Sequence, residues 1–499
     1  MNNTIERLLK NGLVVLFIFI AGSLVVFMPS FGRIFSSDDF CTLEYICKDN
    51  HFLVPGFFRP VGDLTLKWTW QLFGAQPFYF YLTNALIHAV NAWLLFIVCR
   101  KIYPQAEHAF VFALMASLTF FFYHSHGEAI LWTIGRGVLL AVFFALAAIV
   151  AFLSQMRFPW KCLLVCVLYF IGLAAYESIF LLPVVLWLVS KNNRYPVRFG
   201  KWAIALGVTL AIHLVLRQMY TGDMMQTYSG TVLGKGVLQF MLDGVKIIFR
   251  VFVPAFNRPA LFAGTASAVV AIVLLIGWRS RKTVFYNAAM RRVLIMGTGG
   301  LICAIAVAMI FSVSTRTAEG DRLLYFPACF FSIIIALLLM QVSNSSARAA
   351  LLIVLTLVQG YFLVTTRNYW IRASEYSEQI VNEVKRTKER PLYIVNLPAD
   401  YRGGYIFRNC FHEALSAFGV NSKNVFVINS LGYVDATSKD GVIVPEKKDG
   451  QIFIWPSTTI FHRNGIVNSI KNDGNEIKVN DVPLNAVFYW DKTGLRHLY

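Results

Sequence analysis

Long apolar segments alternate with short charged ones from near the start of the chain to about residue 365. A helix that crosses a bilayer needs about 20 mostly apolar residues, because every backbone polar group inside the hydrocarbon must be paired within the protein. Only 14% of the residues are charged, whereas a soluble domain carries about 25%. The pattern therefore predicts a multi-pass α-helical membrane protein.

The apolar segments predict about eleven transmembrane helices. They lie at 11–29, 79–99, 108–123, 133–154, 161–176, 178–190, 202–217, 259–277, 293–312, 323–341 and 349–365. The segment 178–190 is short for a span, so we expect it to be tilted, re-entrant or merged with its neighbour. Residues 237–256 carry Asp243, Lys246 and Arg250 among apolar residues, a spacing typical of an amphipathic helix lying in the membrane interface.

Basic residues predict the orientation of these spans. Arg100 and Lys101, Arg157, Lys161 and the cluster within 279–292 fall on one side, which the positive-inside rule assigns to the cytoplasm. The N-terminus is then expected inside, and the first span is expected to be a retained anchor. Much of the net charge of +18 follows from this topology. We therefore expect the lipid bilayer, and no nucleic acid, as a partner.

The chain changes character after the last span, which predicts two domains: a transmembrane domain over 1–370 and a small extracytoplasmic α+β domain over 371–499. The segments that predict the second domain are strands at 391–398, 425–428, 442–444 and 451–455 and a short helix at 411–418. Its role is open between acceptor binding, capping of an active site and simple stabilisation of the fold.

Two of the eight cysteines, Cys41 and Cys47, share the first loop on the outer side. They either form a disulfide in an oxidising compartment or remain two thiols, and the sequence does not separate these outcomes. Cysteines inside the spans are expected to be small packing residues.

Nearly all carboxylates before residue 366 fall on the outer side under this topology. Ionisable groups close to the hydrocarbon are costly and usually face a cavity or a partner, so the working site is expected there. Asp38 and Asp39 directly follow the first span. Because adjacent residues cannot share one face, one carboxylate can take a proton from an attacking hydroxyl while the other makes a supporting contact. A solvated loop pair is the alternative.

A second group combines Arg59 with a polar stripe on the helix that comes after it. Arginine is a planar, permanently charged donor that suits a phosphate. Asn84, His88 and Asn91 lie at helical spacings of four and three, so they share one face and should meet protein or a cavity. We interpret Asn84 and Asn91 as partners in hydrogen bonds between helices.

Two further groups lie at membrane boundaries. His124, His126, Glu128 and Arg136 form the first. Two histidines alone do not make a zinc site, so we favour positioning of an anionic donor over binding of a divalent metal. In the second group, Arg322 follows Asp321 and precedes Tyr325. Arg322 either pairs with the acids beside it in the sequence or faces a phosphate.

These groups, in this order, resemble the C-type glycosyltransferases, integral membrane enzymes that take a sugar from a polyprenyl-phosphate carrier. The acidic pair after the first span is similar to the family's first-loop motif, and the Arg59-Pro60 segment and the polar helix are similar to the next segments in one subgroup of that family. The remaining matches are the segment from His124 to Trp132 with Gly135-Arg136, where Ser125 replaces a proline; Tyr176-Glu177-Ser178, where Tyr176 replaces a lysine; and Asp321-Arg322…Tyr325…Pro327.

The resemblance covers roughly residues 1–370. It implies an inverting transfer of a monosaccharide from a polyprenyl (undecaprenyl) phosphate to an extracytoplasmic glycan acceptor, such as O-antigen of lipopolysaccharide, in a bacterial inner membrane. It implies no required cofactor, and a donor synthase and a flippase as partner proteins. The implied roles are Asp39 or Asp38 as the base; Arg59, Arg136 and Arg322 at the donor phosphate; and His88, His124, His126, Glu128, Glu177 and Tyr325 around the sugar or the acceptor.

Two other functions remain open. A transporter or flippase would also have many spans, but its polar groups are expected near the midplane and its halves are expected to repeat. A polysaccharide polymerase or ligase acting on lipid-linked glycans would use a diphosphate-linked donor and a large outer loop between late spans. The acidic pair after the first span favours monosaccharide transfer.

Overall fold

The computed structural model describes residues 12–103, 105–192, 199–222, 236–311, 313–388, 391–432, 446–448, 451–454, 459–460, 467–470, 477–479, 486–491 and 494–498. The chain forms two compact units. The first, the helical unit, comprises Met1–Phe31 and His51–Thr365. The second, the C-terminal unit, comprises Gly32–Asn50 and Thr366–Tyr499, so a short segment after the first span belongs with the end of the chain.

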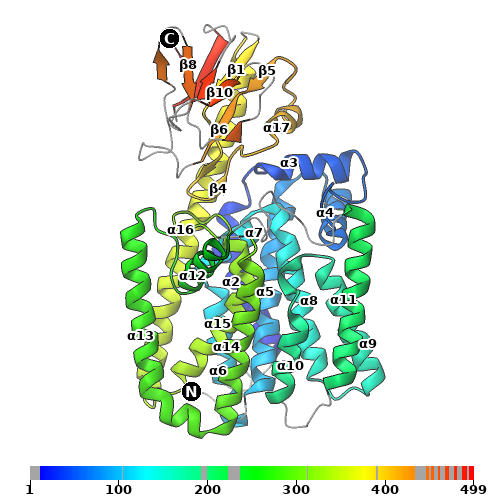
Figure 1. Ribbon diagram of the computed structural model, residues 1–499, viewed down its shortest axis with the longest axis vertical. Coiled ribbons are helices and arrows are strands. Elements are labelled where there is room, and N and C mark those ends of the chain that lie inside the picture. The colour runs from blue at the N-terminus through cyan, green and yellow to red at the C-terminus, as the bar shows by residue number, and fades with distance from the viewer. Residues whose placement is uncertain are drawn as a thin grey trace. The chain divides into compact units, whose positions relative to one another are not determined.

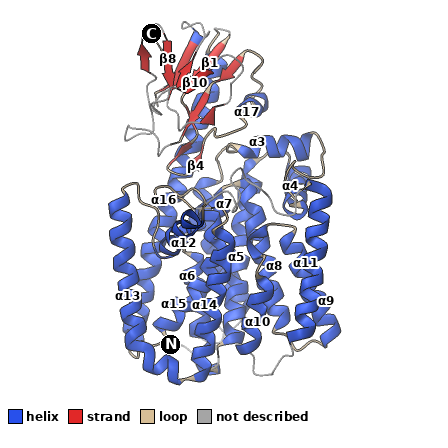
Figure 2. Ribbon diagram, in the orientation of Figure 1, coloured by secondary structure: helices blue, strands red, loops and turns tan. Residues whose placement is uncertain are grey.

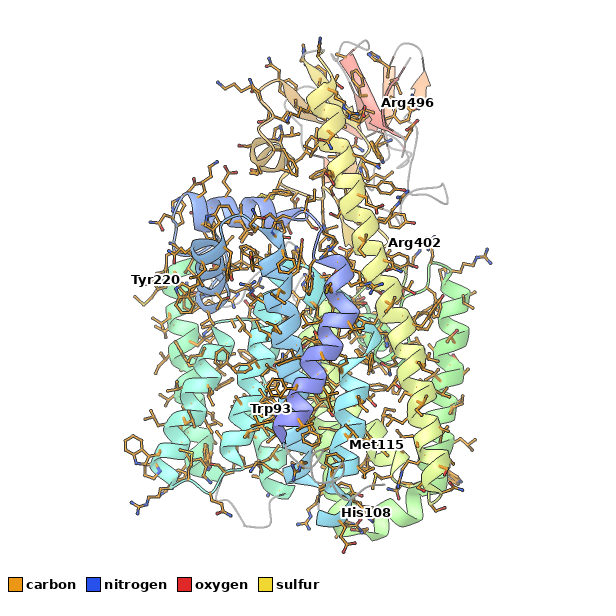
Figure 3. The ribbon with its side chains drawn as sticks, turned by 180° about the vertical axis from the view of Figure 1, so that it is seen from behind. Trp93, His108, Met115, Tyr220, Arg402 and Arg496 are labelled. Carbon is orange, nitrogen blue, oxygen red and sulfur yellow. A yellow bond between two sulfur atoms is a disulfide. The ribbon has the colours of Figure 1, made fainter. Side chains whose placement is uncertain are left out.

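Each of the eleven expected spans coincides with a helix (Figure 1). These helices are α2 (Gly12–Phe27), α5 (Pro77–Ile102), α6 (Ala106–Phe121), α8 (Arg136–Phe152), α9 (Phe158–Leu173), α10 (Leu182–Asn192), α11 (Phe199–Thr221), α13 (Pro259–Tyr286), α14 (Ala288–Ala308), α15 (Tyr325–Leu339) and α16 (Ser345–Arg386). Hydrogen bonds join some of these helices. For example, the indole N–H of Trp93 in α5, labelled in Figure 3, donates to the Gly12 carbonyl of α2 at 2.7 Å.

The chain is a multi-pass membrane protein. Seven of the described helices are long and apolar enough to cross a bilayer, and an eighth qualifies if Glu107–Phe121 and His124–Leu131, bent by 50°, form one span. Two apolar helices are shorter, Phe158–Leu173 and Pro259–Ile272, and α10 has 11 residues. Large apolar side chains are exposed along these helices, as at Phe17, Leu274 and Leu357. Such surfaces are expected where helices meet lipid.

Helix α12 (Val237–Phe252) is not among the candidate spans, and Figure 1 shows it end-on, whereas the long helices of the helical unit run vertically in the picture. Its charged side faces protein, because Asp243 and Arg250 are buried. Its apolar side is exposed at Leu238, Met241, Leu242, Val245 and Ile248. These positions recur at helical spacing, so α12 is the amphipathic helix that the sequence predicts.

The strands lie in the C-terminal unit (Figure 2). One sheet has the order β13-β12-β1-β5, with β1 (Leu392–Val395) parallel to both β12 (Val487–Trp490) and β5 (Val425–Val427) and β12 antiparallel to β13 (Leu495–His497). A second, antiparallel sheet has the order β10-β11-β8-β7 from Val467–Ile470, Ile477–Val479, Gln451–Ile454 and Glu446–Lys448. Shorter pairings join β2 (Leu397–Pro398), β6 (Asn429–Leu431) and β9 (Thr459–Ile460), and β3 (Asp400–Tyr401) with β4 (Gly404–Tyr405).

The expected α+β character of the chain's end is confirmed. Three of the predicted strand segments contain β1, β5 and β8, and the predicted short helix is α17 (Phe411–Ala417). The expected strand at 442–444 lies outside the described residues. In β1 the side chains of Leu392, Ile394 and Val395 are fully buried, as expected for the central strand of a covered sheet.

The cysteine pairing differs from both outcomes considered for the first loop. Cys41 is bonded to Cys410, with the two Cα atoms 5.5 Å apart and 369 residues between them in the sequence. The expectations of a Cys41–Cys47 disulfide or of two thiols are therefore wrong. The reason is that residues 32–50 fold with the C-terminal segment, which brings Cys410 beside Cys41.

Candidate functional site

The acidic pair opens a six-residue helix, α3 (Asp38–Leu43), in the C-terminal unit. Asp39 is fully buried, and its Oδ2 accepts a hydrogen bond from the Ser36 backbone N–H at 3.1 Å. Asp39 is the second residue of α3, so this contact ties the first turn of the helix to the backbone just before Ser37. Asp38 is half-buried, and its Oδ1 accepts a hydrogen bond from the Asn409 side chain at 2.8 Å. One carboxylate thus supports the backbone while the other remains accessible.

Arg59 belongs to a cluster of three charged side chains in the helical unit. The Glu177 carboxylate accepts hydrogen bonds from Arg59 Nε and Nη2, at 3.3 and 3.1 Å, and from Arg217 Nη1 at 2.9 Å. The Arg59 guanidinium also lies over the ring of Tyr176, 4.2 Å from its centroid. All three charged side chains are largely buried, with exposed fractions of 14%, 13% and 4% for Arg59, Glu177 and Arg217.

This cluster carries one net positive charge, because two guanidinium groups share one carboxylate. Burial alone would raise the pKa of Glu177, but Arg59 and Arg217 outweigh burial and hold that pKa below its ordinary value. The carboxylate therefore stays ionised at neutral pH. Arg217 Nε has no hydrogen-bond partner among the described residues. The cluster has the charge and a spare donor to bind an anion.

Arg217 is a residue that sequence reasoning missed. It lies near the end of α11, after a long apolar run, with His213 one helical turn before it. His213 and Arg217 are both buried. Among the described residues, Glu177 is the only acid in contact with Arg217. A basic residue inside a predicted span is a signal for function, and that signal was available at this position.

Asp63 lies one helical turn after Arg59, in the first turn of α4 (Pro60–Phe73). Its side chain is almost fully buried, and Oδ2 accepts a hydrogen bond from the Val54 N–H at 3.3 Å. Burial raises the pKa of Asp63 to about 6, although the Val54 N–H and the charge of Arg59 act in the opposite direction. The buried, ionised Asp63 carboxylate therefore destabilises the folded protein at neutral pH.

We expect Asp63→Asn to stabilise the protein at pH 7. The folded protein holds the Asp63 proton up to about pH 6, whereas the unfolded chain releases it near pH 4. Stability therefore falls as the pH rises from about 4 to about 6, and the full cost above that range is about 3 kcal/mol. Melting temperatures in detergent between pH 4 and 8 should converge at low pH and separate at high pH. Parallel curves for the two proteins would contradict the prediction.

The third group is held by an ion pair between distant segments. Glu128 lies in α7 (Gly127–Leu131), after the 3₁₀ turn His124–His126, and Arg322 lies in the 3₁₀ turn Asp321–Leu324. The buried Glu128 carboxylate accepts from the Arg322 guanidinium and, at 2.8 Å, from the Arg322 backbone N–H. Arg322 also lies over Trp132, 5.0 Å from the ring centroid, and its side chain is 21% exposed. Arg322 thus forms an ion pair with Glu128, which is distant from it in the sequence.

Asp321 pairs with Arg250 of α12. Arg250 is completely buried and also donates to the carbonyls of Ser314 and Val253, at 2.9 and 2.7 Å. The Arg250 carbonyl is in turn 3.2 Å from His124 Nε2. This imidazole therefore helps to fix α12 against the polar turns, and sequence analysis did not foresee the role of Arg250.

His88 and Tyr325 form a closed network with Asn91. Because the Phe121 carbonyl can only accept, the proton lies on His88 Nε2, 3.1 Å away. His88 Nδ1 then accepts from the Tyr325 hydroxyl at 2.8 Å, and that oxygen accepts from Asn91 Nδ2 at 3.2 Å. The expected helix-to-helix role of Asn91 is confirmed by its second bond, to the Leu139 carbonyl at 2.9 Å. Asn91 Oδ1 is buried without a hydrogen-bond partner among the described residues, whereas both ring nitrogens of His88, the Tyr325 hydroxyl and Asn91 Nδ2 are paired within the protein.

His126 lies beside this network. Its ring is 4.4 Å from that of Tyr325 and 4.6 Å from that of Phe120, measured between centroids. It is fully buried, and neither ring nitrogen has a hydrogen-bond partner among the described residues. The aromatic contacts therefore explain how the His126 ring is packed, but they do not explain why its two ring nitrogens are buried without hydrogen-bond partners among the described residues.

Arg136 of α8 connects its own helix to α4 and α5 through hydrogen bonds. It is completely buried at the start of α8, and it donates to Asn84 Oδ1 at 2.9 Å, Thr65 O at 3.0 Å, Thr69 Oγ1 at 2.7 Å and Phe80 O at 3.1 Å. Asn84 in turn donates to the Ile130 carbonyl of α7 at 3.3 Å, and this bond together with that from Arg136 of α8 confirms its expected helix-to-helix role. With its donors used by protein, Arg136 does not suit the phosphate role implied for it, so we leave it out of the donor site.

Close backbone packing explains why the residue before Arg136 is a glycine, Gly135. A Cβ atom at this position would collide with the Ala129 carbonyl oxygen and lie 3.0 Å from the Glu128 carbonyl oxygen. The close approach lets the turn fold back under α7, which places Arg136 at the start of α8 and Glu128 opposite Arg322.

The chain is similar in fold to solved structures. No protein-family model matches the chain, and no curated protein matches it. The fold is similar to that of ArnT from Cupriavidus metallidurans, which was solved bound to undecaprenyl phosphate. The similarity covers 84% of this chain and 92% of that chain, with 12% sequence identity and a TM-score of 0.43.

Proposed function

We propose that this protein is an inverting glycosyltransferase that moves a monosaccharide from a polyprenyl phosphate, such as undecaprenyl phosphate, to a hydroxyl of an extracytoplasmic glycan. The observation that carries the proposal is the Arg59–Glu177–Arg217 cluster, a buried excess of positive charge at the ends of apolar helices. A phosphate on a long apolar chain needs a fixed cation of this kind at the membrane boundary. The ordered set of motifs shared with the C-type glycosyltransferases supports the same function.

The reaction is a single displacement at the anomeric carbon. The acceptor hydroxyl oxygen attacks that carbon, the bond from the carbon to the phosphate oxygen breaks, and its electron pair stays on the polyprenyl phosphate. Asp38 takes the hydroxyl proton on Oδ2, because Oδ1 is engaged by Asn409. The leaving phosphate is a stable anion, so it needs no strong acid.

Arginines stabilise the charge that grows on the leaving phosphate. In the proposal Arg59 and Arg217 hold the phosphate, and fixed cations in a partly dry site are more effective there than in water. Arg322 is the further donor-side cation, because it alone of the remaining implied arginines is partly exposed. Glu128 holds Arg322 in place, while His88, His124 and Tyr325 fix the surrounding helices.

The proposal includes the cellular setting. We infer that the C-terminal unit is extracytoplasmic, in a bacterial inner membrane, with the N-terminus inside. The Cys41–Cys410 disulfide supports this, since disulfides persist in oxidising compartments. The distribution of basic residues supports the same orientation. The acceptor is then a surface glycan such as O-antigen, and the partner proteins are a synthase that makes the donor and a flippase that delivers it.

The test is sugar transfer by the purified protein in detergent, with a panel of radiolabelled polyprenyl-phosphate sugars and a mixed surface-glycan acceptor. We expect at least one donor to be consumed, with release of one polyprenyl phosphate for each sugar transferred and an inverted anomeric centre in the product. Retention of configuration would contradict the displacement. Activity only with diphosphate-linked donors would indicate a polymerase or ligase. Movement of lipid-linked sugar across proteoliposomes without transfer would indicate a flippase.

A further inference from the structure

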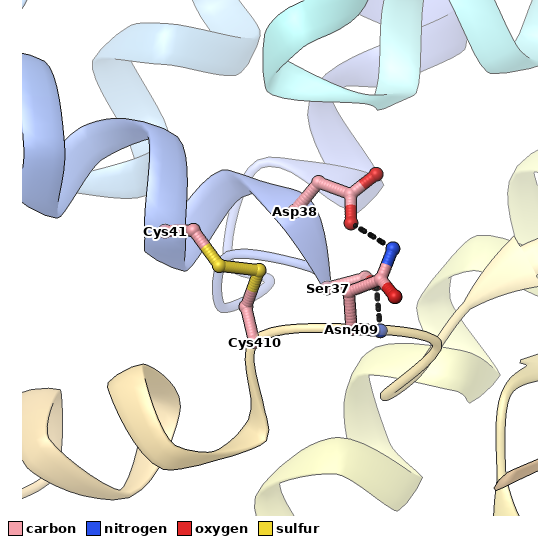
Figure 4. The surroundings of a disulfide bond; sticks show 5 residues. All are labelled: Ser37, Asp38, Cys41, Asn409 and Cys410. Atoms are coloured by element: carbon pink, nitrogen blue, oxygen red, sulfur yellow. Dashed lines mark hydrogen bonds between the residues drawn. A yellow bond between two sulfur atoms is a disulfide. The ribbon is translucent and has the colours of Figure 1, made fainter. Parts of the chain in front are cut away.

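Three contacts join the start of α3 to Asn409 and Cys410, which directly precede α17 (Figure 4). Cys41 is bonded to Cys410. The neighbouring Asn409 donates from its side chain to Asp38 Oδ1 at 2.8 Å and from its backbone N–H to Ser37 Oγ at 3.1 Å. Because Asp38 and Cys41 are three residues apart on one helix, they lie on the same face. The disulfide and the amide therefore hold the same side of α3.

The backbone around these contacts is strained. Ser37 has φ 45° and Cys410 has φ 63°, both in the left-handed region that side chains other than glycine rarely adopt. Such residues cost about 1–3 kcal/mol each and persist where the surroundings fix them. Ser37 is fixed by its N–H bond to the Ile406 carbonyl at 3.2 Å as well as by Asn409. Strain on both sides of the contact indicates that the geometry at Asp38 is enforced.

Helix α3 cannot hold this geometry by itself. It has six residues, whereas isolated helices shorter than about 12 residues are marginal in water. Its other fixed points are also in the C-terminal unit: Asp39 accepts a hydrogen bond from the Ser36 N–H, and the Phe40 ring lies 6.3 Å from that of Phe418. The orientation of the Asp38 carboxylate therefore depends on the segment 406–418.

We propose that Asn409 and the Cys41–Cys410 disulfide are positioning groups for Asp38, so that sugar transfer depends on the oxidised state of this bond. The inference rests on the proposed function, in which Asp38 is the base. It assigns a role to the C-terminal unit: this unit orients the proton acceptor. Asn409 is exposed and both sulfurs belong to half-buried residues, so an added reductant can reach the bond.

The experiment compares Asn409→Ala and the double variant Cys41→Ser/Cys410→Ser with two matched controls. Asn421→Ala removes another exposed asparagine of the same unit, whose side chain accepts a hydrogen bond from the nearby Lys423 N–H. Cys47→Ser removes a cysteine of the same segment that is not in the disulfide. Transfer kinetics give kcat and the KM for the donor. Hydrogen–deuterium exchange of residues 36–46 reports the order of α3 without any need for transfer.

We expect both test variants to lower kcat by about ten- to hundredfold, the size of effect that a small misplacement of a catalytic group produces. The donor KM should change by less than about twofold, because neither variant removes a group that the proposal assigns to the donor phosphate. Exchange in residues 36–46 should be faster. Wild-type protein treated with a phosphine reductant should behave like the double cysteine variant and recover on reoxidation, while both controls should match wild type.

The outcomes separate this inference from the proposed function. Normal kcat in both test variants, or unchanged exchange in residues 36–46, would overturn the positioning role. An equal loss of kcat in the controls would also overturn it, because the effect would then be general instability. If wild-type protein transfers no sugar from any donor, the proposed function fails, and the exchange experiment still decides whether Asn409 and the disulfide order α3.

Discussion

Asp38→Asn is expected to lower kcat by about a thousandfold, because general-base catalysis contributes about 10²–10⁴ to enzymatic rates. The amide has nearly the same shape as the carboxylate, and its oxygen still accepts the hydrogen bond from Asn409. It cannot take the proton of the acceptor hydroxyl. Binding of the donor should survive, so the melting temperature of the variant should still rise when polyprenyl phosphate is added. Steady-state transfer and thermal melting in detergent are the two measurements.

Asp39→Asn is the matched control for this prediction. Asp39 is fully buried and accepts a hydrogen bond from the Ser36 N–H, so its loss should appear mainly as a lower melting temperature. We expect its kcat to stay within about tenfold of wild type, since the asparagine still has a side-chain oxygen that can accept the hydrogen bond from the Ser36 N–H. The opposite result, with transfer lost only in Asp39→Asn, would assign the base to Asp39. Full transfer in both variants and in the double variant would exclude this loop and direct attention to Glu128.

The membrane part of the fold could be predicted because its signal is local. Runs of about 20 apolar residues must become helices in a bilayer, and every predicted span coincides with a helix. The helix-to-helix roles of Asn84 and Asn91 followed from their spacing on one face, without knowledge of their partners. Even α12 was recognisable, because Asp243, Lys246 and Arg250 suit an amphipathic helix and a span there would place the basic cluster within 279–292 on the outer side.

Partners distant in the sequence could not be predicted. Cys410 lies 369 residues from Cys41, and no local pattern indicates that residues 32–50 fold with the end of the chain. The arginines illustrate the same limit. Arg59 and Arg136 look equivalent in the sequence, yet the donors of Arg136 are taken up by acceptors on α4 and α5, while Arg59 shares its carboxylate with Arg217. Only the packing separates a structural cation from one suited to an anion.

Glu177→Gln is expected to lower the free energy of unfolding by about 3–5 kcal/mol, the usual cost of removing one partner from a buried ion pair. The variant leaves Arg59 and Arg217 without the carboxylate that now accepts three of their N–H groups. Because the two guanidinium groups hold the pKa of Glu177 low, this stabilisation is present above about pH 4 to 5 and is lost as the pH falls further. The matched control is Glu375→Gln, since Glu375 pairs with Arg372 on the surface. An exposed pair of this kind contributes about 0–1 kcal/mol.

The same variant tests whether the cluster binds a phosphate. In Glu177→Gln the two arginines are left with two uncompensated charges, so an added polyprenyl phosphate can replace the missing carboxylate. We expect the lipid phosphate to raise the melting temperature of Glu177→Gln more than that of wild type, and to restore part of the lost stability. The uncharged polyprenol should raise neither. Equal shifts in both proteins would place the phosphate away from Arg59 and Arg217, and would leave Arg322 as the cation to test at the donor site.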